Sequence, residues 1–330
     1  MLKVGVVGLG NWGTALANHL ANKGYDVLGW EKNPQVVESI NATHVNAIYQ
    51  KDVVLCKNLK ATSNISDLKD SDMILLVVPS FALNSVIPQL PINDDMLIVS
   101  AIKGLERNSL KTPIDYVLST FNNVNKNNCA VLSGPSFAAD IVRFRPCGVV
   151  SAGFCEDTAK KVANIFTSES MRVYFSTDPV GVEIGAVVKN VIALASGVCD
   201  GMELGESAKA VLITRGLTEM VRLGVAVGGQ EKTLFGLSGI GDLILTATCD
   251  TSRNRTVGKR LGKGESLQNI IDTLGSVAES VTTTPLVLEL AKKHNVSMPI
   301  AEEVNKLLKG EVKPIDLLKD LMDRPLKFEY

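Results

Sequence analysis

The sequence predicts an α/β protein in which a doubly wound, mostly parallel sheet is followed by an all-helical C-terminal domain. Up to residue 177, short β-branched runs alternate with helical patterns, which is typical of parallel strands joined by crossover helices. Beyond that point the alternation largely disappears and helical patterns continue to the end. We therefore expect two domains, residues 1–177 and 178–330, and 330 residues are enough for two separate cores.

The expected strands are short apolar runs at residues 3–8, 26–30, 73–78, 97–101, 130–133, 148–152 and 172–176. Between them we expect helices at 14–22, 35–42, 81–87, 114–121 and 158–166. The run at 73–78 is apolar on both faces, as expected of a central strand covered by helices on each side. In the second domain we expect helices at 180–199, 209–226, 242–249, 255–261, 285–293 and 300–308, the first of them capped by Thr177 or Asp178.

Composition excludes several classes of function. A net charge of −1 gives no electrostatic reason to expect nucleic acid or an anionic membrane as a partner. The six cysteines form no CxxC pair and no metal-like group with the three histidines, so we expect reduced thiols and no metal. The start of the chain has no signal-peptide pattern, and the apolar run 184–199 is too short to span a bilayer. We expect a cytoplasmic protein without membrane insertion.

The first strand leads into Gly8-x-Gly10-x-x-Gly13, and an Ala/Leu-rich helical segment follows. Gly8 permits a tight turn, Gly10 allows a pyrophosphate to approach the backbone, and Gly13 allows the helix to pack against the strand. The helix N-terminus offers unpaired N–H groups to the phosphates. The motif in this context predicts a Rossmann-like site for NAD or NADP.

The residues after the second strand leave the choice of cofactor open. Glu31 lies near the offset at which an acidic group binds the adenosine ribose hydroxyls. Lys32 follows directly and is an alternative partner for the 2′-phosphate of NADP. Trp12 either flanks the cofactor or belongs to the core.

Lys189 is the first candidate for proton chemistry, because it is the only charged residue between Glu183 and Asp200 in an apolar helix. Burial of an ammonium group is costly unless it is paired, and the usual response is a lowered pKa. Such a lysine can donate and accept a proton. The alternative is a lysine that reaches solvent from the rim of the packed face.

Lys103 follows a predicted central strand, at the edge where doubly wound sheets bind ligands, and a lysine there can stabilise a phosphate or an oxyanion. Gly134 and Ser136 lie at another strand–turn–helix junction that suits a small anion or the cofactor. A solvated lysine and a plain connecting turn are the alternatives.

The most polar cluster of the helical half contains Asp242, Ser252, Arg253 and Asn254. Asp242 either caps a helix or holds Lys189 through a charge-assisted bond. Arg253 and Asn254 suit a phosphate, with a solvated loop as the alternative.

These motifs together resemble the NAD(P)-dependent glycerol-3-phosphate dehydrogenases, most closely the bacterial form. The matching segments, in the family's order, are 8–15, 77–80, 103–106, 133–138, 188–191, 200–201, 214–219, 239–243 and 252–255. The resemblance implies that Lys189 is the proton donor and acceptor, Lys103 a second essential lysine near cofactor and substrate, and Asp242 the group that orients Lys189.

The resemblance also assigns contacts with substrate and cofactor. It implies substrate contacts for Lys103, Gly134, Ser136, Lys189, Asp242, Ser252, Arg253 and Asn254. It implies cofactor contacts for Gly8, Gly10, Asn11, Trp12, Gly13, Lys32, Lys103, Ala138, Arg253, Val277 and Glu279. The family usually has glycine at the position of Ser280. This difference affects the expected geometry of the loop beside the cofactor.

The expected reaction is reversible reduction of dihydroxyacetone phosphate to sn-glycerol 3-phosphate, with domain closure around the substrate. The resemblance further implies a cytoplasmic homodimer that supplies glycerol 3-phosphate for phospholipid synthesis. Two alternatives remain at this point: another β-hydroxyacid or ketoacid reductase with a carboxylate substrate, and a non-catalytic NAD(P)-binding sensor.

Overall fold

The computed structural model describes residues 1–275, 278–316 and 328. It divides into two compact units, Met1–Glu183 and Ile184–Tyr330, so the division falls within the long helix α7 (Pro179–Gly201). The sequence places the domain boundary slightly earlier, before this helix, and that position stays a prediction. Asp178 caps α7, since its Oδ1 accepts the Gly181 amide hydrogen at 2.9 Å.

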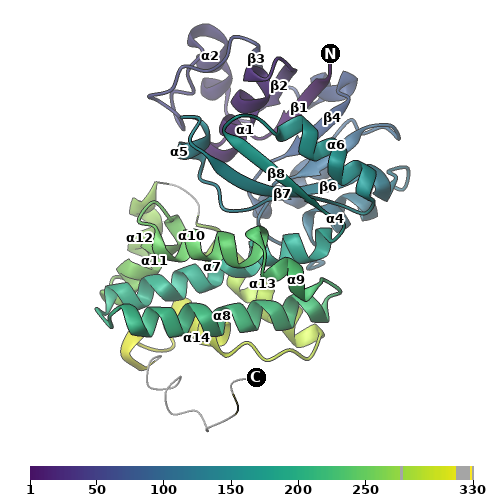
Figure 1. Cartoon of the computed structure of the whole chain (residues 1–330). Helices are drawn as coiled ribbons and strands as arrows, with labels where there is room; N and C mark the ends of the chain where they lie inside the picture. Colours follow the sequence, from purple (N-terminus) through teal and green to yellow (C-terminus); the bar gives the residue numbers. More distant parts are fainter. Residues whose placement is uncertain (276–277, 317–327, 329–330) are drawn as a thin grey trace. The chain divides into compact units, whose positions relative to one another are not determined.

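The first unit contains an eight-stranded sheet in the order β3-β2-β1-β4-β5-β6-β7-β8 (Figure 1). The strands are β1 (Lys3–Val7), β2 (Asp26–Trp30), β3 (Leu59–Thr62), β4 (Met73–Leu76), β5 (Leu97–Ser100), β6 (Cys129–Ser133), β7 (Cys147–Gly153) and β8 (Met171–Ser176). All neighbours are parallel except β6 and β7. The mostly parallel, doubly wound sheet expected from the sequence is thus confirmed. Every residue of β4 is buried, as expected for a central strand.

The helices of this unit are α1 (Asn11–Asn22), α2 (Pro34–Thr43), α3 (Leu83–Val86), α4 (Pro113–Thr120), α5 (Ala138–Ile141) and α6 (Glu156–Phe166). α1 and α6 contact each other on one face of the sheet (Figure 1). This follows from the handedness of crossover connections, because β7 and β8 run opposite to β1, which brings the α6 crossover to the α1 face.

Two expectations for this unit are wrong. The strand β3 was not anticipated, because Leu59–Thr62 is short and contains a lysine on its exposed side. The single helix expected at 81–87 is instead a series of short turns, η2 (Ser80–Ala82), α3 and η3 (Ile87–Gln89). Pro88 lies at the start of η3 and has no N–H to continue a helical ladder. Two further 3₁₀ turns are η1 (Ile65–Asp70) and η4 (Lys126–Asn128).

The described part of the second unit is helical. It contains α7, α8 (Glu206–Ala226), α9 (Glu231–Leu234), the π-helical turn η5 (Leu237–Gly241), α10 (Asp242–Thr248), α11 (Arg253–Gly262), α12 (Leu267–Leu274), α13 (Glu279–Lys293) and α14 (Pro299–Leu308). The short elements α9, η5 and α12 were not anticipated. The helix expected to begin at Pro285 begins at Glu279 instead, and Pro285 lies inside it. Proline is a probable but not obligatory helix start.

Helix α7 is the core of the second unit. Its backbone packs directly against that of α11, because a methyl group on Gly197 would overlap the Arg255 carbonyl oxygen and one on Gly258 would overlap that of Leu194. Gly216 of α8 lies against Ile192, and Gly185 lies against the backbone of Ser238 in η5. The contacts of α7 with three elements, α11, α8 and η5, therefore depend on glycine.

The apolar run 184–199 lies in a longer helix than the sequence predicts, so the expectation that it is too short to span a bilayer is wrong. The helix that contains this run has 23 residues, which is long and apolar enough to cross a membrane by length and composition. Its 18-residue apolar window is 94% buried inside the structure. Burial of this kind is typical of a core helix packed inside a folded domain. The six cysteines are free, and no metal-binding group of His, Cys, Asp and Glu occurs among the described residues.

Candidate active site

The glycine-rich turn has the backbone geometry that its motif predicts. Gly8 adopts φ +102°, and a methyl group on Gly13 would overlap the carbonyl oxygen of Gly8. A methyl group on Gly10, by contrast, would have no atom within 4 Å. The turn is therefore closed where strand and helix pack, and open where a pyrophosphate would approach the N-terminus of α1.

Buried polar side chains hold this turn in place. The Thr14 hydroxyl donates to the carbonyl oxygen of Leu9 at 2.8 Å, and the Asn46 amide donates to the same oxygen at 2.9 Å. Asn46 is fully buried and lies in the loop after α2. Sequence reasoning missed Asn46, because nothing in its local pattern separates it from an ordinary loop asparagine. Gln50 from the same loop lies 3.3 Å from the Asn11 side chain.

Glu31 lies directly after β2, and its carboxylate contacts the glycine-rich turn. Its Oε2 accepts the Leu9 amide hydrogen at 2.9 Å, and its Oε1 accepts that of Asn33 at 3.2 Å. Lys32 is exposed to solvent. The open Gly10, the helix N-terminus and an acidic group beside the turn all fit a dinucleotide cofactor. We infer that the residues around Gly8–Gly13 would hold its pyrophosphate.

Lys103 and Gly134 come together after neighbouring strands. Because β5 and β6 are parallel, the loops that follow them leave the same edge of the sheet. The Lys103 ammonium lies 3.4 Å from the Gly134 carbonyl oxygen and 5.9 Å from the centre of the Trp12 ring. Gly134 adopts φ +149°, and a methyl group there would lie 2.8 Å from the Val149 Cα. Only glycine fits this position without strain.

Ser136 and Ala138 follow in the same junction. The Ser136 hydroxyl donates to the Gly134 carbonyl oxygen at 3.0 Å, and Ala138 begins α5. The first unit thus brings together the residues that the sequence singled out around one sheet edge: Trp12, Lys103, Gly134 and Ser136.

The second unit contains a buried ion pair on its central helix. The Lys189 Nζ of α7 lies 2.8 Å from the Asp242 Oδ1 and donates to the Thr246 hydroxyl oxygen at 2.8 Å. Lys189 is 4% exposed and Asp242 is 1% exposed. Asp242 and Thr246 are one turn apart on α10, so both face the same ammonium group. The solvent-reaching lysine that we considered as an alternative is thus not what the structure contains.

Asn190 and Asn254 form a second polar link beside this pair. The Asn254 amide donates to the Asn190 Oδ1 at 2.9 Å, and the Asn254 Oδ1 accepts the Ser280 amide hydrogen at 3.0 Å. Asn254 therefore joins α7, α11 and the first turn of α13. The Ser280 side-chain oxygen is buried and has no hydrogen-bond partner within the described residues.

Arg253 and Asn254 are the first residues of α11 and not a loop. Ser252 caps the helix, since its hydroxyl oxygen accepts the Arg255 amide hydrogen at 3.3 Å. Arg253 is exposed, and half-buried Glu279 begins α13. Val277, which the resemblance assigns to the cofactor site, lies outside the described residues.

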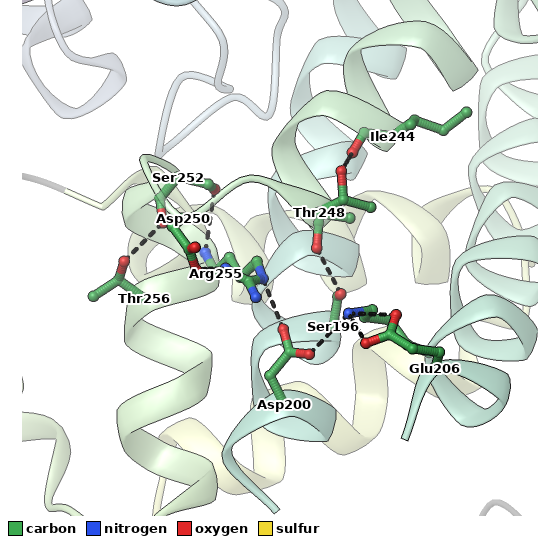
Figure 2. A network of polar contacts seen from close by, with 11 residues as sticks. Ser196, Asp200, Glu206, Ile244, Thr248, Asp250, Ser252, Arg255 and Thr256 are labelled. Carbon is green, nitrogen blue, oxygen red and sulfur yellow. Dashed lines mark hydrogen bonds and ion pairs between the residues drawn. The ribbon is translucent and has the colours of Figure 1, made fainter. Parts of the chain in front are cut away.

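Figure 2 shows an ionic network that anchors this helix start, with Arg255 between the carboxylates of Asp200 and Asp250. The Arg255 Nε lies 2.7 Å from the Asp200 Oδ2, at the end of α7, and the hydrogen bond from Arg255 lowers the pKa of Asp250. Lys209 of α8 also contacts Asp200, at 3.0 Å. Arg255 is buried, so this network fixes the turn from which Arg253 projects.

Sequence reasoning noted the types of residue in this cluster but not their roles. The sequence pattern by itself assigns no role to Thr246, Arg255 or Asn190. The residues next to a helical hydroxyl or guanidinium group in the sequence do not reveal its partner in the folded protein, because that partner lies on another helix.

Comparison with known proteins decides the family. The family model described as NAD-dependent glycerol-3-phosphate dehydrogenase N-terminus matches residues 3–159, and the model of the C-terminus matches residues 178–319. This chain belongs to the NAD-dependent glycerol-3-phosphate dehydrogenase family. The expectation from the sequence motifs is confirmed, and the chain is an NAD(P)-dependent dehydrogenase.

Full-length relatives of this dehydrogenase support the same family assignment. The glycerol-3-phosphate dehydrogenase [NAD(P)+] of Leptospira biflexa is 43% identical, with 99% of each chain covered. The enzyme of Geobacter sulfurreducens is 42% identical, over 99% of this chain and 98% of the relative. A crystal structure of the Coxiella burnetii glycerol-3-phosphate dehydrogenase superposes with a TM-score of 0.92 at 36% identity, covering 98% of this chain and 99% of that one. These findings support neither of the two alternatives left open by the sequence, which were a carboxylate-specific reductase and a non-catalytic sensor.

Proposed function

We propose that this dehydrogenase interconverts dihydroxyacetone phosphate and sn-glycerol 3-phosphate, with Lys189 as the proton donor and acceptor. The observation that carries the assignment is the buried Lys189 ammonium, paired at 2.8 Å with Asp242 in a chain of this family. A bound nicotinamide cofactor supplies the hydride for reduction of the carbonyl carbon. The remaining chemistry is a proton transfer to the carbonyl oxygen, which a positioned ammonium group can perform.

Asp242 and Thr246 act as positioning residues for this ammonium group. Both groups bind the Lys189 Nζ at 2.8 Å and so fix the position of the ammonium group on α7. Lys103 supplies a second positive charge, which stabilises the negative charge that develops on the substrate oxygen. In the reverse direction Lys189 accepts the hydroxyl proton.

We assign the substrate phosphate to the start of α11. Arg253 projects from the first turn, where its guanidinium can form two parallel bonds to a phosphate, and the helix N-terminus favours an anion. Asn254, Ser252, Gly134 and Ser136 remain proposed substrate contacts. Asn254 also carries the structural link between Asn190 and Ser280, so its loss would affect more than the phosphate. Asn11, Ala138 and Glu279 remain proposed cofactor contacts.

The test is an assay of Lys189→Met with dihydroxyacetone phosphate and each reduced cofactor. We expect turnover to fall by about 100-fold or more, with cofactor affinity unchanged. Lys292→Met, which removes an exposed lysine from the last turn of α13, is the matched control and keeps its rate. Near-normal turnover in a folded Lys189→Met would show that Lys189 is not the acid.

The cellular setting is part of the proposal. A cytoplasmic enzyme of this family would supply glycerol 3-phosphate for phospholipid synthesis, and we propose a homodimer. Sedimentation at several protein concentrations tests the homodimer, which a single monomeric species would contradict.

A further inference from the structure

Glu31 is held by contacts to the neighbouring strand β3, to the glycine-rich turn and to Asn33. Its backbone N–H donates to the Thr62 carbonyl oxygen at 3.0 Å, which extends the pairing of β2 with β3 by one residue. Its carboxylate accepts the amide hydrogens of Leu9 and Asn33, at 2.9 and 3.2 Å. The negative charge of Glu31 is therefore fixed in position and not free to swing into solvent.

This fixed charge lies at the place where the adenosine ribose of a dinucleotide is bound in such sheets. β1 and β2 are parallel, and the Gly8 amide donates to the Trp30 carbonyl oxygen at 2.9 Å, so the glycine-rich turn and Glu31 share one sheet edge. The ribose is attached to the pyrophosphate that the turn receives. A carboxylate has about four acceptor positions, and the Leu9 and Asn33 amides occupy two of them. The others can accept ribose hydroxyl hydrogens.

We propose that Glu31 makes this enzyme select NADH over NADPH. This deepens the proposed function, because it names which nicotinamide cofactor the site takes. The 2′-phosphate of NADPH would bring further negative charge against a carboxylate that cannot withdraw without losing its bonds to the turn. Juxtaposed like charges are strongly unfavourable at a partly buried site.

Lys32 does not offset this repulsion. It is exposed to solvent, and it follows Glu31 directly at the point where the chain turns into α2. An exposed lysine on a flexible stem attracts a phosphate only weakly, because water and salt screen the interaction. The Glu31 carboxylate, in contrast, is half-buried and hydrogen-bonded at both oxygens.

The test measures equilibrium binding of NADH and NADPH to the substrate-free enzyme by titration calorimetry, so it does not depend on turnover. We expect the wild type to bind NADH about 10- to 100-fold more tightly than NADPH. Glu31→Gln keeps an acceptor for the Leu9 amide and removes the charge, so its NADPH affinity is expected to rise about 10-fold or more while its NADH affinity changes little or falls slightly. Glu38→Gln removes an exposed carboxylate from α2 and is expected to leave the ratio unchanged.

Two results would overturn the proposal. One is a wild type that binds NADPH as tightly as NADH, which stays decisive even if Glu31→Gln fails to fold. The other is a folded Glu31→Gln with the wild-type ratio. A Lys32→Ala variant that loses NADPH affinity selectively would place the 2′-phosphate on Lys32 instead. Failure of the proposed reaction would appear differently, as cofactor binding without oxidation by dihydroxyacetone phosphate.

Discussion

The Lys189 ammonium and the Asp242 carboxylate form an ion pair of 2.8 Å in which neither side chain is more than a few per cent exposed. Removal of two charges from water is costly, and a buried pair of this kind often contributes little net stability. A role in proton transfer explains its presence on the core helix of the second unit better than a contribution to folding stability does. The two contributions can be separated by mutation.

Asp242→Asn is expected to lower turnover about 100-fold and to destabilise the enzyme by about 3–5 kcal/mol, because it leaves the ammonium buried without its counter-charge. The double variant Lys189→Met with Asp242→Leu removes both charges and is expected to recover most of that stability without activity. Steady-state kinetics and urea unfolding measure the two effects. A double variant as unstable as Asp242→Asn would contradict this account.

Thr246→Val removes the hydroxyl that accepts a hydrogen bond from Lys189 and keeps the shape of the side chain. A hydrogen bond to a charged group contributes about 1.5–3 kcal/mol, so we expect a fall in turnover of about 10-fold or more. Thr248→Val is the matched control, since its hydroxyl also donates to a carbonyl oxygen one turn earlier in α10 and it is exposed. Equal losses of turnover in both variants would show that the Thr246 hydroxyl supports only the structure of α10 and not the position of Lys189.

Arg255→Lys is expected to raise the KM for dihydroxyacetone phosphate about 10-fold with a smaller change in kcat, because an ammonium group does not reproduce the planar guanidinium geometry that joins Asp200 to Asp250 (Figure 2). The first turn of α11 would then be less firmly placed. Arg260→Lys changes another paired arginine of the same helix, the partner of Glu265, and should leave the KM within about twofold. An unchanged KM in Arg255→Lys would show that the ionic network does not position the phosphate-binding residues.

Gly258→Ala is expected to destabilise the enzyme by about 1–3 kcal/mol or more, because the added methyl group would overlap the Leu194 carbonyl oxygen of α7. The helices would have to separate, which also displaces Arg253. Thermal unfolding measures the loss, with exposed Lys263→Ala as the control. An unchanged melting temperature in Gly258→Ala would contradict the close contact of α7 with α11.

Glu219 makes stability depend on pH. Burial raises its pKa to about 7, although its oxygens accept the Ile300 and Ala301 amide hydrogens at the start of α14. The folded state therefore holds the proton more tightly than the unfolded state. The resulting stabilisation is complete below the ordinary pKa of 4.5 and is lost as the pH rises through about 7.

Glu219→Gln imitates the protonated carboxyl group, so its stability should vary less with pH than that of the wild type. Up to roughly 3 kcal/mol of the wild-type decline between about pH 5 and pH 8 is expected to disappear. Urea unfolding at several pH values measures this, with Glu302→Gln, an exposed residue in the first turn of α14, as the control. A wild-type pH slope retained in Glu219→Gln would exclude this carboxyl group as its source.

Much of the candidate site could be predicted from the sequence where a local pattern carries the information. The glycines at positions 8, 10 and 13 act through backbone geometry between consecutive elements, so their spacing is itself the signal. Lys189 was recognisable as the single charge in an apolar helix. Asn46 and Thr246 were not, because each has a role only through a partner brought to it by folding.

The sequence by itself determined the order of most strands and helices, though not β3 or the short elements α9, η5 and α12, and it determined the mostly parallel sheet, the change to helices near residue 178 and the turn that would receive a dinucleotide. These features depend on contacts between residues close in the chain and on the periodicity of apolar side chains. Only the tertiary structure decided the antiparallel pairing of β6 with β7, the glycine contact of α7 with α11 and the attachment of Glu31 to the Leu9 amide. Each of these joins segments that are distant or unrelated in local pattern, and their free energy is gained only when the packed core brings them together.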